Sequence, residues 1–152
     1  MSRAFLKETD DPVGDLPERT VSPHRNLVTL EGLVAIETEL GRLEEERRGI
    51  PADDRAALAR VDRDLRYWRA RRATAEPIEP PKETGKVQFG STLTIRRDDQ
   101  REQTLTIVGE DEADPTIGKI SYVSPLARAV MGKKADDVVE VGPVVVEVLA
   151  VK

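Results

Sequence analysis

The chain has 152 residues, of which 38% are hydrophobic, 35% charged and 3% aromatic, and its formal net charge is -5. That is too little apolar material for one compact globule of this length, so we expect a modest core joined to extended or solvated structure. The negative charge argues against a general electrostatic grip on nucleic acid or on an anionic membrane. The absence of cysteine excludes disulfides, thiolate metal sites and cysteine nucleophiles.

Residues 1–28 are rich in proline and charged residues and show no sustained hydrophobic periodicity, which is typical of a flexible tail. Phe5 is the candidate for a docking contact within this tail. His24, the only histidine, also lies here, so a histidine-based triad or metal site has no support. The N-terminus lacks the apolar region of a signal peptide, and no apolar run approaches the length that spans a bilayer. We therefore expect a soluble cytoplasmic protein without a membrane partner.

Residues 29–76 carry the clearest periodic pattern. Apolar residues recur at heptad spacing in two runs: Leu33, Ile36, Leu40 and Leu43, then Leu58, Val61, Leu65 and Trp68. Glycine and proline between the runs, in Gly49–Pro51, end one helix and start another. Neither helix alone covers its apolar stripe, so the pattern predicts an antiparallel helical hairpin with Trp68 in the core of its base. Arms of roughly 20 residues would extend about 30 Å.

The two predicted arms differ in charge. The first is rich in glutamate and the second in arginine: Glu37, Glu39, Glu44, Glu45 and Glu46 against Arg55, Arg60, Arg63, Arg66, Arg69, Arg71 and Arg72. One interpretation is salt bridging between the arms at the positions that flank the apolar seam. The other is a stripe of guanidinium groups that follows phosphates or an acidic groove.

Two adjacent carboxylates, Asp53 and Asp54, lie at the predicted tip of the hairpin. They either cap the second helix and complement the positive end of its dipole, or point outward and complete a metal site in a partner.

Residues 77–84 form a proline-rich linker, and the periodicity then changes to two over residues 85–152. Short strands are predicted at Lys86–Phe89, Ser91–Arg96, Gln103–Val108, Lys119–Tyr122, Asp137–Val141 and Val144–Val151. One short helix is predicted to start at the Ser124 cap with Pro125 in its first position and to stop at Gly132. Asp111–Asp114 spells a helicase box, but no glycine-rich phosphate loop accompanies it, so we interpret Gly109–Asp114 as an acidic turn after a strand. The fold class is therefore α+β: a helical hairpin, or short coiled coil, followed by a mostly antiparallel sheet.

This arrangement resembles the GreA/GreB transcript-cleavage factors of bacterial RNA polymerase. The resemblance rests on Val87–Ser91, Ile107–Asp114 and Ser124–Lys133 at consistent spacing, and it covers residues 30–152. The N-terminal Met1–Phe5 is also similar to the start of GreB-like members. The resemblance implies an FKBP-like fold for residues 85–152.

In function, the resemblance implies a transcription elongation factor and not an enzyme in its own right. The C-terminal domain would hold the rim of the secondary channel of RNA polymerase, and the hairpin would enter that channel. Carboxylates at the tip would help to bind the second catalytic Mg²⁺ of the polymerase, whose own site then cuts the backtracked RNA near its 3′ end. The chain would need no cofactor of its own. The implied polymerase-binding residues are Val123, Ser124, Pro125, Leu126 and Arg128, and the implied tip carboxylates are Asp53 and Asp54.

Two departures from the family pattern keep alternatives open. Val123 stands where the family usually has a small polar or acidic residue, and Gly49–Arg55 replaces the family's acidic tip run on shorter arms. A short hairpin is similar to the regulator-of-nucleoside-diphosphate-kinase branch, so one alternative is a regulator that occupies the channel without stimulating cleavage. A remote alternative is an FKBP-type prolyl isomerase or chaperone, which needs an aromatic pocket, while only Phe89 and Tyr122 are aromatic after the linker. The oligomeric state is open.

Overall fold

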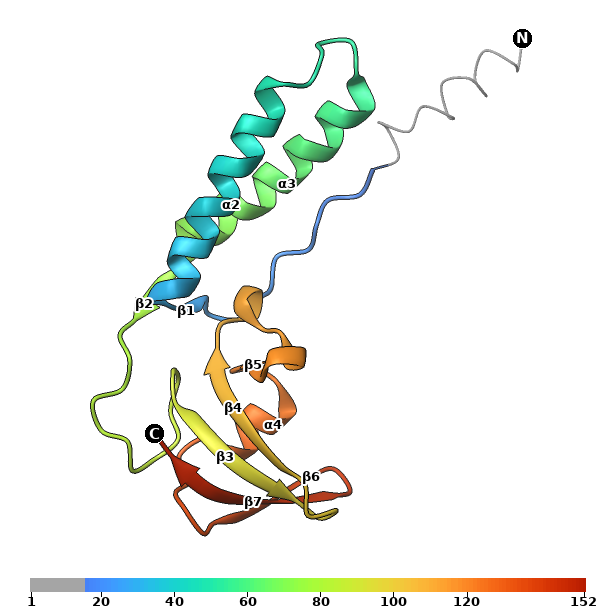
Figure 1. Ribbon diagram of the computed structural model, residues 1–152. Helices are drawn as coiled ribbons and strands as arrows, with labels where there is room; N and C mark the ends of the chain where they lie inside the picture. The colour runs from blue at the N-terminus through green and yellow to red at the C-terminus, as the bar shows by residue number, and fades with distance from the viewer. Residues whose placement is uncertain (1–15) are drawn as a thin grey trace. The chain divides into compact units, whose positions relative to one another are not determined.

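The structure is a computed structural model that describes residues 16–152 (Figure 1). The predictions made for Phe5 and for Met1–Phe5 lie outside the described residues. By their contacts the described residues form two compact units, one made of residues 16–23 and 36–74 and the other of residues 24–35 and 75–152. Within residues 16–152, no helix combines the length and the apolar character that a membrane span requires.

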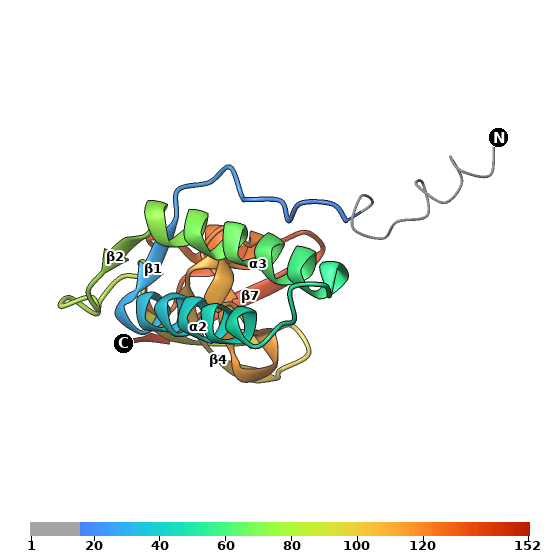
Figure 2. The same ribbon diagram turned by 90° about the horizontal axis from the view of Figure 1, so that it is seen from above.

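The first unit is a helical hairpin, as the heptad pattern predicted. Helix α2 spans Leu30–Arg48 and helix α3 spans Arg55–Thr74, and the two lie side by side in both views (Figures 1 and 2). The buried residues of the predicted runs are Ile36, Leu43, Val61 and Leu65. Leu40 and Trp68 are partly buried and pack against this core. The apolar seam therefore falls where the sequence placed it.

Residues 16–23 follow helix α3, although the sequence predicted a flexible tail there. The guanidinium of Arg19 stacks over the ring of Tyr67, 4.0 Å from its centroid, and forms a 3.4 Å ion pair with Asp64. Glu18 forms an ion pair with Arg66. Cation–π and ion-pair contacts have no periodic signature, so the pattern of apolar residues did not predict them.

A small parallel pair of strands begins the second unit. Strand β1 spans Leu27–Thr29 and strand β2 spans Glu76–Ile78, with Leu27 opposite Glu76. The sequence placed the start of β1 in the tail and most of β2 in the linker. These strands are only three residues long and one contains proline, so neither shows the alternation by which strands are predicted. A backbone hydrogen bond of 2.8 Å from the N–H of Glu76 to the carbonyl of Asn26 extends the pairing.

The main sheet has five strands in the order β5-β4-β3-β7-β6. They are β3 (Thr92–Arg97), β4 (Glu102–Val108), β5 (Lys119–Ser121), β6 (Val138–Val141) and β7 (Val144–Val151). All neighbours are antiparallel except β4 and β5. Two 3-10 turns, η1 (Glu110–Glu112) and η2 (Pro115–Ile117), precede β5, and helix α4 (Pro125–Val130) follows it. The predicted α+β class, a hairpin followed by a mostly antiparallel sheet, is confirmed.

The core of this unit lies on one face of the sheet. Its buried residues alternate along β3, β4 and β7 and are joined by two residues of α4: Leu93, Ile95, Leu105, Ile107, Val146, Val148, Ala127 and Val130. Helix α4 thus presents its buried face to the sheet and leaves the opposite face to solvent.

The strand predicted at Lys86–Phe89 is wrong. Val87 instead exchanges two hydrogen bonds of 2.8 Å with the loop after α4, donating to the carbonyl of Lys133 and accepting from the N–H of Gly132. A turn follows, in which Gly90 adopts a φ of 87°. The alternation in Lys86–Phe89 therefore reflects one buried valine docked on a loop, not a strand in the sheet.

Candidate polymerase-docking turn and hairpin tip

The turn between β5 and α4 is held by a dense set of local hydrogen bonds. The Ser124 hydroxyl accepts from the N–H of Ala127 at 3.3 Å, and Pro125 occupies the first helical position, as the sequence predicted. The N–H of Ser124 donates to the carbonyl of Ser121 at 3.0 Å, and the N–H of Val123 donates to the Ser121 hydroxyl at 3.2 Å. The conformation of this turn is thus fixed before any partner binds.

The structure divides the five predicted docking residues by exposure. Pro125 and Arg128 are exposed, whereas Val123, Ser124 and Leu126 are half-buried. Leu126 packs against the core of the sheet unit. Pro125 and Arg128 are three positions apart on one helical turn and so project from the same side of α4. The surface that a partner would meet is therefore an apolar ring beside a guanidinium group.

Tyr122, at the start of this turn, anchors it to other parts of the same unit, a role that the sequence did not reveal. Its hydroxyl donates a hydrogen bond to the carbonyl of Arg25, and its N–H donates to the carbonyl of Val108 at 2.9 Å. Its ring also packs edge to face against Phe89, with centroids 5.5 Å apart. The two aromatic residues after the linker therefore act as mutual packing partners, which gives the prolyl isomerase alternative no support.

A glutamate clamp joins η1 to the start of helix α2. Glu112 Oε2 accepts from the N–H of Thr29 at 2.9 Å and from the N–H of Gly109 at 3.1 Å, and its Oε1 accepts from the Thr29 hydroxyl. That hydroxyl in turn accepts from the N–H of Gly32 at 2.9 Å and so caps α2. A carboxylate at this position also complements the positive end of the helix dipole.

Gly32 is required by the close approach of this clamp. A Cβ added at Gly32 would lie 2.2 Å from Glu112 Cδ, far inside van der Waals contact. The sequence predicted an acidic turn after a strand at Gly109–Asp114, and a 3-10 turn follows β4 there. The clamp itself was missed because Thr29 and Glu112 are 83 positions apart.

The two carboxylates at the hairpin tip, Asp53 and Asp54, have different surroundings. Asp54 Oδ1 accepts from the N–H of Ala57 at 3.2 Å, and the Asp54 carbonyl accepts from the N–H of Leu58 at 3.1 Å. Asp54 therefore caps α3. The exposed Asp53 side chain makes no hydrogen bond with any of residues 16–152. Across these same residues, no cluster of three or more acidic, histidine or cysteine side chains is placed to hold a metal ion.

The relatives of this chain are transcription elongation factors. A family model described as "Transcription elongation factor, GreA/GreB, C-term" matches residues 81–152. GreA of Legionella pneumophila (strain Paris) is 40% identical over 139 residues, which cover 75% of this chain and 85% of that protein. The chain belongs to the GreA/GreB family. GreB of Yersinia pestis is 32% identical over 136 residues, which cover 76% of this chain and 80% of that protein.

Other matches to GreA/GreB proteins are partial or structural. GreB of Neisseria meningitidis serogroup B is 41% identical over 85 residues, a match that spans only about half of that protein (52%) and 54% of this chain. The solved GreA/GreB elongation factor from Nitrosomonas europaea is 24% identical, with a TM-score of 0.39 and coverage of 84% of this chain and 98% of that one.

Some arginines of the helical hairpin in this GreA/GreB family member form ion pairs. Arg47 pairs with Asp62 at 2.6 Å and Arg72 pairs with Glu37 at 3.3 Å, and both of these pairs join the arms. The hydrogen bond from Arg47 lowers the pKa of the Asp62 carboxyl below its ordinary value. Salt bridging between the arms, the first of the two interpretations of their charge, is therefore confirmed at these positions.

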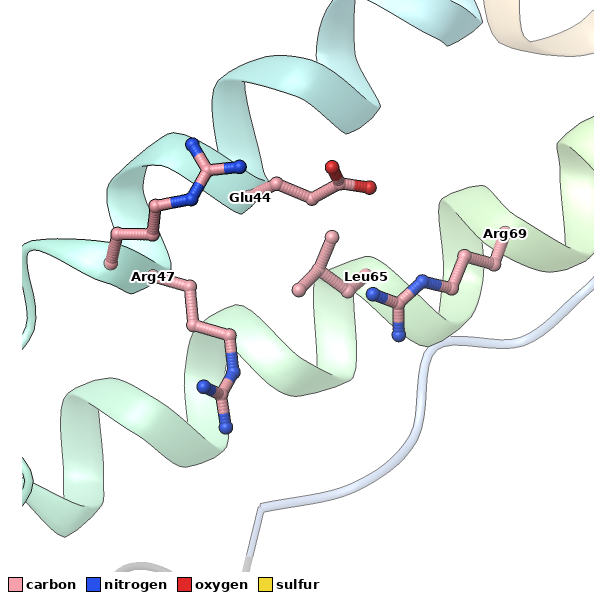
Figure 3. Close-up of a pocket in the computed structure, with 5 residues that line it drawn as sticks. Glu44, Arg47, Leu65 and Arg69 are labelled. Atoms are coloured by element: carbon pink, nitrogen blue, oxygen red, sulfur yellow. The ribbon is translucent and has the colours of Figure 1, made fainter.

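A pocket of about 390 Å³ lies between the two helices of the hairpin, with Leu65 at its buried floor (Figure 3). It is lined by Glu44, Arg47, Arg48, Leu65 and Arg69. Two of its three arginines already form ion pairs, Arg47 with Asp62 and Arg48 with Glu45. The remaining guanidinium, on Arg69, shares the pocket with the opposite charge of Glu44. This balance of charge does not favour a phosphate ligand.

Proposed function

We propose that this GreA/GreB family elongation factor binds RNA polymerase at the rim of the secondary channel through Val123–Pro125, with Leu126 and Arg128 in support. The observation that carries the proposal is the prebuilt turn at the start of α4, which lies inside the segment that matches the family model. A turn already held by its own hydrogen bonds loses little conformational freedom on binding.

The chemistry of the turn indicates what it would bind. The Pro125 ring offers a fixed apolar contact, and the exposed Arg128 makes no ion pair within residues 16–152. A guanidinium without a carboxylate partner favours an acidic group on the polymerase. Val123, in place of the family's usual small polar or acidic residue, adds apolar surface and removes a charge. The contact would therefore be an apolar patch flanked by one ion pair.

Replacing Pro125 by glutamate tests the docking assignment. Glutamate is favourable in the first turn of a helix, so α4 should keep its Ser124 cap while the apolar contact is lost. We expect affinity for core RNA polymerase to fall by a factor of about 30, as for a binding hot spot worth about 2 kcal/mol. The double variant Ser124→Glu/Pro125→Glu should abolish co-purification.

The matched control for these variants is Pro143→Glu, because Pro143 is an exposed proline in the turn between β6 and β7. It should bind like the wild-type chain. Survival of binding in the double variant would show that the polymerase does not dock on this turn.

Two activities at the tip are compatible with this docking. In one, Asp53 and Asp54 lend carboxylate oxygens to the second catalytic Mg²⁺ of the polymerase and promote cleavage of backtracked RNA at its 3′ end. In the other, the hairpin occupies the channel without stimulating cleavage. The capping role of Asp54 favours the second, because it leaves Asp53 as the uncommitted carboxylate of the pair. Further metal ligands would have to come from the polymerase.

A transcript-cleavage assay on stalled, backtracked elongation complexes separates the two activities. Asp54→Asn keeps an N-cap of nearly equal strength while it removes the charge, and Asp53→Asn removes the uncommitted carboxylate. For the channel-occupying regulator we expect no stimulation by wild type and no effect of either variant. Stimulation by wild type that disappears in Asp53→Asn would instead establish the role in cleavage.

A further inference from the structure

Ile117, in the turn η2, is an exposed apolar side chain at the opposite end of β5 from the docking turn. The residue is 65% exposed, the highest value among the large exposed hydrophobics of residues 16–152. A single exposed apolar residue is common on protein surfaces and is not by itself a site. Ile117 differs from Val34 on α2 and Val138 on β6, which are 62% and 60% exposed, in lying next to β5, the strand that leads into the proposed docking turn.

The turn that presents Ile117 is rigidly built. Asp114 Oδ1 accepts from both the N–H and the hydroxyl of Thr116, at 3.1 and 2.5 Å. The N–H of Ile117 donates to the Asp114 carbonyl at 3.1 Å. Gly118 closes the turn with a φ of 77°, and a Cβ there would lie 2.6 Å from the carbonyl oxygen of Thr104. These hydrogen bonds hold the backbone at Ile117 in one conformation while its side chain faces solvent. Binding of a partner to Ile117 would therefore cost little backbone entropy.

The same segment also closes the outer edge of β5. Asp114 and Lys119 exchange two backbone hydrogen bonds of 2.8 and 3.1 Å, and the N–H of Ser124 covers the carbonyl of Ser121. These bonds occupy both backbone groups of Lys119 and the carbonyl of Ser121, so the outer edge of β5 does not offer the run of free backbone groups that strand addition needs. Side-chain contacts are therefore the favoured mode of binding at this edge.

We propose that Ile117 is a second apolar contact of the polymerase-docking surface, separated from Val123–Pro125 by the length of β5. The inference rests on the function proposed above. From Gly118 to Tyr122 the chain advances about 13 Å at about 3.3 Å per residue, so one continuous partner surface can reach both contacts. The polymerase would present an apolar patch to Ile117 and Pro125 and a carboxylate to Arg128.

The test compares Ile117→Ser with Val138→Ser in equilibrium binding to core RNA polymerase. Val138 is the matched control because it is 60% exposed and lies on β6, the opposite edge of the same sheet. We expect Ile117→Ser to weaken binding about tenfold, which corresponds to about 1.4 kcal/mol, and Val138→Ser to leave affinity unchanged. Thermal unfolding of both variants checks that each is folded.

The outcomes separate this inference from the proposed function. If the wild-type chain does not bind core polymerase, both fail. If wild type binds and Pro125→Glu loses binding while Ile117→Ser binds like wild type, the docking turn stands and the role of Ile117 is refuted. Equal weakening by Ile117→Ser and Val138→Ser would also refute it, because the effect would then not be local to the edge of β5.

Discussion

Replacing Glu112 by alanine should destabilise the unit formed by residues 24–35 and 75–152. The substitution removes the acceptor of three hydrogen bonds, from the Thr29 N–H, the Thr29 hydroxyl and the Gly109 N–H. A hydrogen bond to a charged group contributes about 1.5–3 kcal/mol, and a carboxylate at a helix N-terminus adds about 0.3–1 kcal/mol. Because the three bonds share one half-exposed carboxylate that water can partly replace, we expect a total loss of about 2–4 kcal/mol.

Glu112→Gln is the matched variant for this prediction. Its amide oxygen can still accept from the two N–H groups, and its amide nitrogen can donate to the Thr29 hydroxyl oxygen. The geometry is kept and the charge is lost, so we expect a smaller cost of about 1 kcal/mol. The exposed Glu79→Ala, in the linker, is the control for loss of a negative charge and should lie within about 0.5 kcal/mol of wild type.

Urea unfolding followed by circular dichroism measures these differences. Amide hydrogen exchange at Thr29, Gly32 and Gly109 reports the clamp locally and should accelerate in Glu112→Ala. An unfolding free energy for Glu112→Ala equal to that of the wild type would refute the clamp as a source of stability. An equal loss of unfolding free energy in Glu112→Ala and Glu112→Gln would refute a contribution from the hydrogen bonds themselves. The stabilisation would then come from the negative charge of Glu112 alone.

Two further predictions concern packing and pH. Gly32→Ala should lower the free energy of unfolding in urea by about 1–2 kcal/mol, because the new Cβ would clash with the Glu112 side chain. This loss is expected even though alanine is the better helix former by about 1 kcal/mol. In the Glu112→Ala background the clash is absent, so the same change should raise the free energy of unfolding. Asp62→Asn should cost about 0.5 kcal/mol at neutral pH, the usual size for an exposed ion pair. The hydrogen bond from Arg47 lowers the pKa of Asp62 in the folded chain below its ordinary value of 3.8. The ion pair therefore contributes its full stability at pH values above 3.8, and this stability is lost as the pH falls through the pKa of the folded chain. Thermal melts of Asp62→Asn and wild type should converge in acid.

The hairpin and the sheet were predictable because their signals are local. Heptad spacing identified Leu43 and Leu65 as seam residues, and the period of two predicted strands at Ser91–Arg96 and Gln103–Val108, where the structure has β3 and β4. The cap at Ser124 was predictable for the same reason, because a serine, a proline and a glycine at short spacing suffice to start and stop a helix. Each of these inferences needs only neighbours within about two turns of helix or one strand.

The contacts that the sequence did not reveal join distant parts of the chain. Thr29 meets Glu112, Arg19 stacks on Tyr67, and Val87 docks on the loop after α4 instead of forming a strand. Such contacts depend on which segments the fold brings together, and no local period encodes them.

In the candidate site, too, the sequence predicted the local features and missed the long-range ones. The sequence by itself determined that a capped turn stands before α4 and that two carboxylates stand at the hairpin tip, because caps, turns and helix periods are properties of adjacent residues. Only the tertiary structure decided that Pro125 and Arg128 face solvent while Leu126 packs inward, and that Ile117 stands at the far end of the same strand. Exposure is decided by what packs against a residue from elsewhere in the chain, and that is set by the fold as a whole.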